Sequence, residues 1–152
     1  MCKRPKDIKT VTVKFGIIPP KGFLAITWFG TMYINKRNKD LWEKEYTDAW
    51  KQIILNHENI HLKQAQREGS WIKFYAKYLW CWLKNMFLCG FKNQIAYYCI
   101  PYEIEAYQHE RNFNYDLEKF DIYQQLSAKI TIPIYKNSGD FSTFKKTIKN
   151  MF

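Results

Sequence analysis

The alternation of apolar and polar side chains near the start of the chain is typical of β-strands. The run Val11-Thr12-Val13-Lys14-Phe15 alternates in this way, and a second β-rich run extends from residue 23 to residue 35. The Pro-Pro-Lys-Gly sequence at residues 19–22 separates the two runs and indicates a turn. We therefore expect an N-terminal β-hairpin at about residues 11–35. Gly30 interrupts its second strand, as at a bulge or a sharp bend.

From residue 40 onward the apolar spacing changes to the i, i+3, i+4, i+7 pattern of an amphipathic helix. We expect a first helix at about residues 41–68. Its N-terminal cap is either Asp40 together with Glu43 or, further along, Thr47. Gly69 is the expected stop.

Two more helices are expected in the middle of the chain. The first, at about residues 71–89, is rich in aromatic side chains and follows Ser70 as a cap. Its expected core stripe is Trp71, Ile72, Tyr75, Tyr78, Leu79, Trp82, Leu83 and Met86. After a loop around residues 91–94, Pro101 begins the second, at about residues 101–114, which carries several glutamates.

The last part of the chain is expected to be less regular. We expect a helical stretch at about residues 117–128, an extended segment at residues 130–134, a turn at residues 137–140 and a short basic helix at residues 141–149. These elements predict an α+β, mainly helical fold. We assign residues 1–130 to one domain and residues 131–152 to a basic C-terminal extension.

Composition narrows the class of protein. The chain has 152 residues, of which 47% are apolar, so it can bury a core and is not intrinsically disordered. The formal net charge is +10, with lysines scattered along the chain. A solvated lysine-rich surface explains this charge, while an anionic partner, nucleic acid or lipid, stays open as an alternative.

The sequence also indicates a cellular location and the relation of the chain to membranes. No standard secretory signal opens the chain, so we expect a cytoplasmic location. Its longest apolar stretch, residues 71–91, is interrupted by lysines and is not expected to span a membrane. A membrane-peripheral placement through this aromatic helix stays open, although core packing is the expected role of the helix. The four cysteines, at positions 2, 81, 89 and 99, lack CxxC spacing and are expected to be buried thiols rather than zinc ligands or disulfides.

The sequence His57-Glu58-Asn59-Ile60-His61 is an HExxH motif on the first expected helix. The four-residue spacing puts both imidazoles on one helical face, one turn apart, where they can share a zinc ion. Glu58 projects about 100° away and can reach a water on the metal without binding the metal itself. This pattern predicts a metal centre, with two core histidines or an accidental match as the competing interpretations.

A catalytic zinc usually has three protein ligands, so a third is expected from another element. The segment from Pro101 to Glu110 is the obvious source. Glu103, Tyr107 and Glu110 share one helical face, whereas Glu105 and His109 share another. Spacing alone therefore leaves Glu103 and Glu105 as alternatives, with Tyr107 and His109 as possible supporting groups.

The Glu-x-Glu-Ala sequence at residues 103–106, after an HExxH helix, resembles the gluzincin arrangement of zinc peptidases. That resemblance favours Glu103, three residues before Ala106, as the third ligand. The gluzincin pattern has Asp or Asn directly after the alanine, and this chain has Tyr107 there. The resemblance therefore does not imply that Tyr107 supports a metal ligand as that Asp or Asn would.

A closer resemblance runs from about residue 21 to residue 116. The segments that carry it are GFLAITWFG at residues 22–30, NHENIH at residues 56–61, FYAKYLW at residues 74–80 and AYYCIPYEIEAY at residues 96–107. They resemble a zinc-metallopeptidase-like family of small HExxH proteins from gut Bacteroidetes and their phages. The resemblance implies a minimal zincin-like domain, with its β-hairpin or small sheet packed on the HExxH helix.

The leading functional hypothesis is a zinc metallopeptidase acting on a peptide or protein. Zn²⁺ held by His57, His61 and Glu103 would activate water, with Glu58 as the general base. The candidates for stabilising the oxyanion of the tetrahedral intermediate are Tyr97, Tyr102, Tyr107 and His109. The β-rich run at residues 23–35 is a candidate to pair with an extended peptide, although a role in the sheet core is the simpler expectation. The alternative hypothesis is a non-catalytic metal-containing module that binds protein, membrane or nucleic acid through its basic surface.

Overall fold

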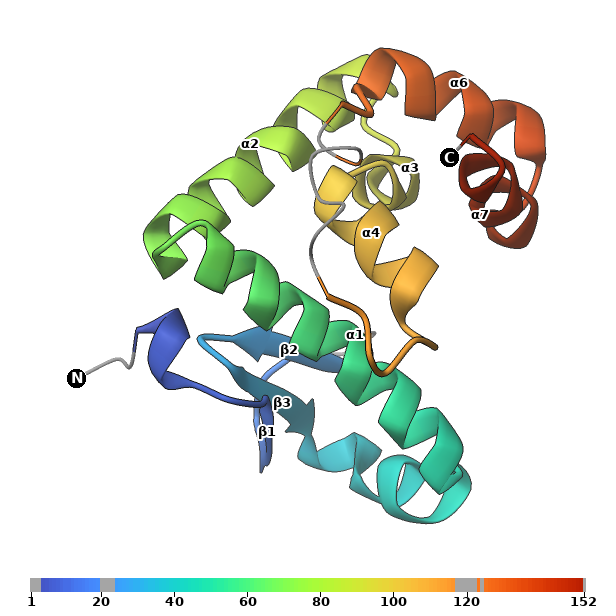
Figure 1. Cartoon of the computed structure of the whole chain (residues 1–152). Coiled ribbons are helices and arrows are strands. Elements are labelled where there is room, and N and C mark those ends of the chain that lie inside the picture. The colour runs from blue at the N-terminus through green and yellow to red at the C-terminus, as the bar shows by residue number, and fades with distance from the viewer. Residues whose placement is uncertain (1–3, 20–23, 117–122, 124, 152) are drawn as a thin grey trace. The chain divides into compact units, whose positions relative to one another are not determined.

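The computed structural model describes residues 4–19, 24–116, 123 and 125–151. It shows a mainly helical α+β protein with one small sheet (Figure 1), which confirms the expected fold class. The chain divides into two compact units. We call Met1–Trp71 with Glu110–Phe113 the sheet unit, and Ile72–His109 with Asn114–Phe152 the helical unit.

The sheet has three strands, β1 (Thr12–Gly16), β2 (Ala25–Trp28) and β3 (Thr31–Asn35), in the order β1-β3-β2. β3 pairs antiparallel with β2 and parallel with β1. The prediction of one hairpin across residues 11–35 is therefore wrong, because the hairpin lies entirely within the second β-rich run.

The turn that splits this run consists of Phe29 and Gly30. Both have positive φ, 50° and 76°, and Trp28 pairs with Thr31 across the strands. Two residues with positive φ match the right-handed twist of the flanking strands. The positive φ favours glycine at position 30, and a Cβ atom there would lie 2.8 Å from the Cδ1 atom of Ile8, so the Ile8 side chain would have to move.

The HExxH helix, α1, spans Asp48–Arg67 and follows a π-helical turn at Leu41–Glu45. Of the two caps expected from the sequence, Thr47 is confirmed, because its hydroxyl accepts a hydrogen bond from the Trp50 amide. Asp40 makes no capping hydrogen bond. The helix therefore begins later than the predicted residue 41. Two short 3-10 helices, Pro5–Asp7 and Lys36–Asn38, complete the sheet unit.

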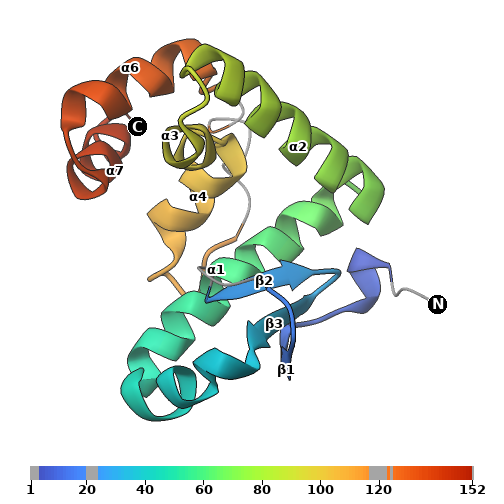
Figure 2. The same cartoon turned by 180° about the vertical axis from the view of Figure 1, so that it is seen from behind.

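Side-chain hydrogen bonds tie the sheet to α1. Asn59 accepts hydrogen bonds from the Val11 amide (2.8 Å) and from the Thr10 hydroxyl (3.1 Å). Met32 and Ile34 of β3 are fully buried. Figures 1 and 2 both show the sheet lying along α1. The sheet thus lies along one side of the HExxH helix. This agrees with the expectation of a small sheet packed on that helix.

The helical unit contains α2 (Trp71–Leu88), α3 (Asn93–Tyr98), α4 (Pro101–His109), α6 (Ala128–Ser138) and α7 (Phe141–Lys149). Figure 2 shows α3, α4, α6 and α7 gathered together. The core that they share comprises Cys89, Ala96, Cys99, Ile104, Tyr123, Leu126, Ala128, Ile132, Phe144 and Ile148. Two of the expected buried thiols, Cys89 and Cys99, belong to this core. Cys81 is only partly buried, and Cys2 lies outside the described residues.

The C-terminal elements differ from the prediction in two ways. Residues 130–134, expected to be extended, lie within α6, whose Ala128, Thr131 and Ile132 are buried at helical spacing. Burial of this face outweighs the β-propensity of the β-branched residues and the cost of Pro133 inside the helix. The second difference is α3, which begins at Asn93 within the loop expected around residues 91–94.

The basic helix at residues 141–149 is confirmed as α7, capped by Asp140. The predicted boundary near residue 130 falls inside α6, and Phe144 and Ile148 of α7 are buried in the shared core. The helical stretch expected at residues 117–128 lies mostly outside the described residues. Among the residues that the structure describes, none of the helices combines the length and the apolar character needed to cross a membrane.

Candidate metal centre

The two histidines of the HExxH motif face each other on α1. His57 and His61 are one turn apart, with ring centroids separated by 4.8 Å. Their Nε2 atoms are 3.2 Å apart. His57 is buried, and only 7% of its surface is exposed, whereas His61 is partly buried. The four-residue spacing on the helix thus brings the Nε2 atoms of the two rings together.

The opposite ring nitrogen of each histidine contacts an oxygen atom. The Nδ1 of His57 is 3.4 Å from a carboxylate oxygen of Glu110, and the Nδ1 of His61 is 2.7 Å from the side-chain oxygen of Gln64. Carboxylate and amide oxygens accept hydrogen bonds, so each contact favours the tautomer with its proton on Nδ1. In that tautomer both Nε2 atoms present a lone pair toward each other.

Two lone pairs at this distance repel unless a proton or a metal ion lies between them. In tetrahedral zinc sites the Zn–N distance is about 2.0–2.1 Å, which places two nitrogen ligands about 3.3 Å apart. The 3.2 Å separation of the two Nε2 atoms fits this value. The oxygen partners on the Nδ1 side match the hydrogen-bonding support that zinc-binding histidines usually have. The donor set of α1 therefore fits a metal ion that takes nitrogen ligands.

Glu110 is held beside His57 by the residue that precedes the motif. The side-chain amide of Asn56 donates hydrogen bonds to the backbone oxygens of Glu110 (2.8 Å) and Asn112 (3.2 Å). The sequence placed Glu110 on a helical face with Glu103, but α4 ends at His109. The predicted helix at residues 101–114 is therefore too long, and Glu110 contacts His57 from the segment that follows α4.

Glu103 lies in the first turn of α4 and is 2% exposed. The Tyr78 hydroxyl donates a 2.5 Å hydrogen bond to its carboxylate. Tyr97 also makes a side-chain hydrogen bond to Glu103. Burial, followed by the charge of Glu103, raises the pKa of Tyr97 well above its ordinary value, so this hydroxyl keeps its proton as a donor at neutral pH. Tyr78, which the sequence placed in a core stripe, thus contacts a candidate metal ligand, and sequence reasoning missed this contact.

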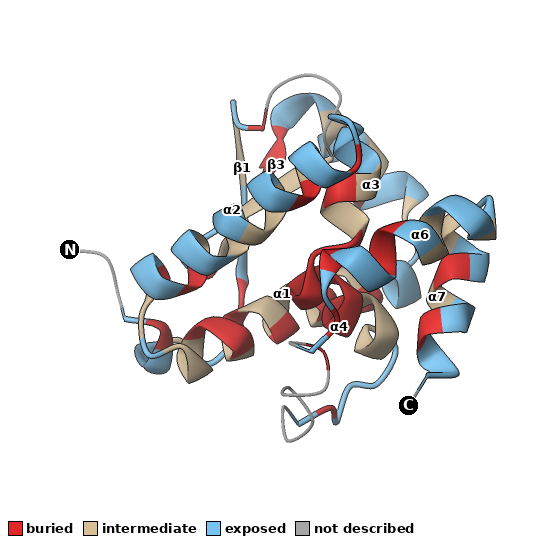
Figure 3. Ribbon diagram, turned by 90° about the horizontal axis from the view of Figure 1, so that it is seen from above, coloured by how far each residue is buried: buried red, intermediate tan, exposed pale blue. Residues whose placement is uncertain are grey.

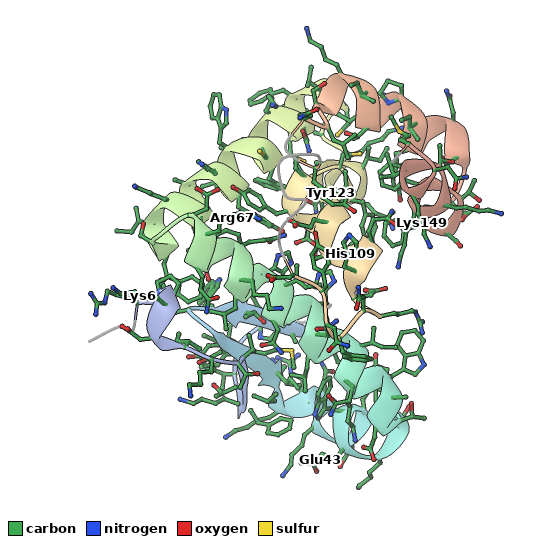
Figure 4. The ribbon with its side chains drawn as sticks, viewed as in Figure 1. Lys6, Glu43, Arg67, His109, Tyr123 and Lys149 are labelled. Atoms are coloured by element: carbon green, nitrogen blue, oxygen red, sulfur yellow. The ribbon has the colours of Figure 1, made fainter. Side chains whose placement is uncertain are left out.

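Glu105 belongs to a different cluster on α4. It is fully buried and accepts a 2.9 Å hydrogen bond from the Tyr115 hydroxyl. Tyr115 stacks on His109 with ring centroids 3.6 Å apart, and His109 Nε2 lies 2.7 Å from the Tyr123 hydroxyl. Figure 4 labels His109 and Tyr123. Burial, followed by the charge of Glu105, raises the pKa of Tyr123 to about 12. The two carboxylates of α4 therefore have separate tyrosine partners.

Within the described part of the chain, one group of three side chains has the geometry to hold a metal ion. It consists of His57, His61 and Glu103, each of which offers a ligand atom within 4.8 Å of the other two. These are the three residues predicted as ligands from the motif and from the gluzincin resemblance. Glu105 and His109 are not in the group.

The remaining predicted residues have varied surroundings. Glu58 lies on α1 directly after His57 and is partly exposed. Tyr102 is fully buried and packs against Phe74 and Tyr78. Tyr107 contacts the rings of Tyr98 and Phe141. Of the four candidates for stabilising an oxyanion, Tyr97 contacts the metal group through its hydrogen bond to Glu103.

No known family model, curated protein or solved structure matches this chain. The resemblance to gluzincins and to small HExxH proteins of gut Bacteroidetes and their phages therefore stays a prediction.

Proposed function

We propose that this chain is a zinc-dependent metallopeptidase. The ligands are His57, His61 and Glu103, and Glu58 is the general base. The observation that carries the proposal is the pair of Nε2 atoms 3.2 Å apart, each on a ring whose Nδ1 contacts an oxygen acceptor. This arrangement favours two nitrogen lone pairs aimed at one point, as a bound cation requires.

The chemistry follows from the residues around that point. A zinc ion bound there would polarise a scissile carbonyl and bring the pKa of a coordinated water toward neutrality. Glu58, one helical step from His57, would accept the proton of the attacking water and deliver it to the leaving amine. Tyr78 and Tyr97 orient the Glu103 carboxylate, which limits its freedom before metal binding.

The sheet suggests how an extended substrate is held. β3 is paired on both sides, so in the run at residues 23–35 the strand at the sheet edge is β2. We propose that β2 adds a peptide substrate by backbone hydrogen bonding, as exposed edges do in other peptide-binding proteins.

The first test is metal content. Protein purified without added metal or chelator is analysed for zinc, wild type beside His57→Ala. We expect about one zinc per chain in the wild type and a loss of at least 100-fold in zinc affinity in the variant, because one of three ligands is removed. A wild type that binds no zinc when zinc is supplied would refute the metal centre.

The second test is hydrolysis of a fluorogenic peptide library by the zinc-loaded protein. Glu58→Gln should keep its zinc but lose at least 100-fold in turnover, because the amide cannot accept the proton. Glu45→Gln, an exposed glutamate of the sheet unit, is the matched control and should keep its activity. Chelation should abolish cleavage and added zinc should restore it. Stoichiometric zinc with no cleavage above the Glu58→Gln background would favour a non-catalytic metal-containing module.

A further inference from the structure

The aromatic helix α2 has two apolar faces, and the structure buries only one of them. On the inner face, Phe74 packs against Tyr102 with ring centroids 5.2 Å apart. Asn85 donates a buried hydrogen bond to the Ala96 carbonyl, and the Trp82 indole donates an exposed hydrogen bond to the Asn93 side chain. This face secures α2 to α3 and α4 within the helical unit.

The opposite face carries large apolar side chains that are exposed. We call Ile72, Leu79, Trp80, Leu83 and Phe87 the outer stripe, and they are 82%, 53%, 67%, 38% and 70% exposed. Figure 3 shows exposed positions along the length of α2. Three of these residues, Ile72, Leu79 and Leu83, were expected in the core stripe, and for them that prediction is wrong. Trp71 is buried as expected, and Phe74, which was not in the expected stripe, is buried as well.

The outer stripe is continuous along the helix. Positions 72, 79, 83 and 87 are separated by seven, four and four residues, so they lie on one line, and Trp80 lies beside it. At 1.5 Å per residue the stripe is about 22 Å long. Phe91, 65% exposed, contacts Phe87 with ring centroids 5.3 Å apart and extends the stripe beyond the end of the helix. Contiguous exposed apolar surface of this kind marks an interaction site.

A line of lysines runs beside the stripe over most of its length. Lys73, Lys77 and Lys84 are all exposed and are spaced by four and seven residues. The lysine line is therefore about 100° around the helix from the line of Ile72 and Leu83. The formal net charge of the whole chain, +10, also favours a negatively charged partner. An occupant of this face must accept apolar and aromatic side chains while presenting negative charge to the lysines.

We propose that the outer stripe of α2 docks on an anionic lipid bilayer surface. The helix lies in the plane of the interface, because its lysine line runs along its length and its inner face is committed to protein. Trp80 and Phe87 enter the boundary between headgroups and acyl chains, and the lysines contact lipid phosphates. This interaction does not involve the metal centre. Its test is therefore independent of the proposed peptidase activity.

Co-sedimentation of the full chain with lipid vesicles tests the proposal. We expect the ratio of bound to free protein to be at least tenfold higher on vesicles of phosphatidylcholine with 30% phosphatidylglycerol than on phosphatidylcholine alone, and to fall as salt is raised. Trp80→Ala/Phe87→Ala should lose most of the binding. Because both side chains are exposed, its circular dichroism and thermal midpoint should match the wild type. Trp50→Ala/Phe113→Ala removes side chains that are 50% and 57% exposed in the sheet unit and should bind as the wild type does.

A charge-matched pair separates the lysine line from net charge. Lys73→Gln/Lys77→Gln/Lys84→Gln and Lys136→Gln/Lys146→Gln/Lys149→Gln each remove three charges from exposed positions. Only the first triple variant should lose the preference for anionic vesicles. Equal losses in both triple variants would overturn the proposal, because net charge alone would then explain the binding. Absence of vesicle binding, or a stripe-dependent dimer in light scattering in place of it, would also overturn it.

Discussion

The two helices that carry the candidate ligands achieve their geometry by different means. On α1 the histidines are four residues apart, so the helix itself sets their separation, and their partners Glu110 and Gln64 only orient the rings. On α4 the two glutamates are two residues apart, so they point in different directions and are buried equally well. Their surroundings distinguish them, because Tyr78 and Tyr97 contact Glu103 whereas Tyr115 contacts Glu105.

A buried carboxylate is therefore not by itself evidence of a metal ligand. The burial of Glu105 is accompanied by a hydrogen bond and an aromatic stack, Tyr115 on His109, that serve the interior of the helical unit. We therefore interpret the Glu105 cluster as structural and keep Glu103 as the proposed metal ligand. Exchanging one glutamate at a time tests whether the two roles are separate.

The largest effect is expected for zinc affinity in Glu103→Gln beside Glu105→Gln. The first substitution removes a charged ligand and should weaken zinc binding at least 100-fold, measured by competition with a fluorescent chelator. The second should leave zinc affinity within about threefold of the wild type. A reversed pattern would make Glu105 the ligand and would end the distinction drawn between the two side chains.

A smaller loss is expected when the support of a histidine is altered. Glu110→Gln replaces the carboxylate 3.4 Å from His57 Nδ1 with an amide. Changes at such supporting positions typically cost 10–100-fold in metal affinity. Asp116→Asn, a change of the same charge in the helical unit, serves as the control. Unchanged zinc affinity in Glu110→Gln would show that helical spacing alone suffices on α1.

The structural role of Glu105 predicts a stability effect without a metal effect. Tyr115→Phe removes the hydroxyl that donates to the Glu105 carboxylate. We expect the free energy of unfolding to fall by about 1–3 kcal/mol, because a buried charged acceptor loses a donor. Chemical denaturation measures this change, and Tyr33→Phe on β3 is the control. Full stability with reduced zinc content would instead assign Tyr115 to the metal centre.

The smallest effect concerns alkaline pH. The pKa of Tyr123 is raised to about 12 from an ordinary value of 10, so the unfolded chain loses this proton at lower pH than the folded chain does. The stabilisation is complete below pH 10 and is lost as pH rises from about 10 toward 12. Tyr123→Phe should reduce this fall in the free energy of unfolding. Identical slopes for the two proteins would show that Tyr123 is not protected by burial beside Glu105.

Much of the fold follows from local signals in the sequence. The bounds of α2 and α7 agree with their apolar spacing, and one of the two expected caps of α1 is present. Errors arise where distant contacts decide. β1 pairs with β3, which follows it after an intervening strand, and no turn residue specifies such a parallel pairing. Residues 130–134 are helical because their helix buries Thr131 and Ile132 in a core that local propensity does not contain.

The sequence by itself determined the histidine pair, because residues four apart on any helix lie on one face and a single helix suffices to bring them together. It also limited the third ligand to a short acidic segment. Only the tertiary structure distinguished Glu103 from Glu105, placed the Glu110 carboxylate against His57 and left the outer stripe of α2 exposed. Each of these outcomes depends on residues far apart in the chain, and spacing within one segment carries no information about which distant side chains will pack against it.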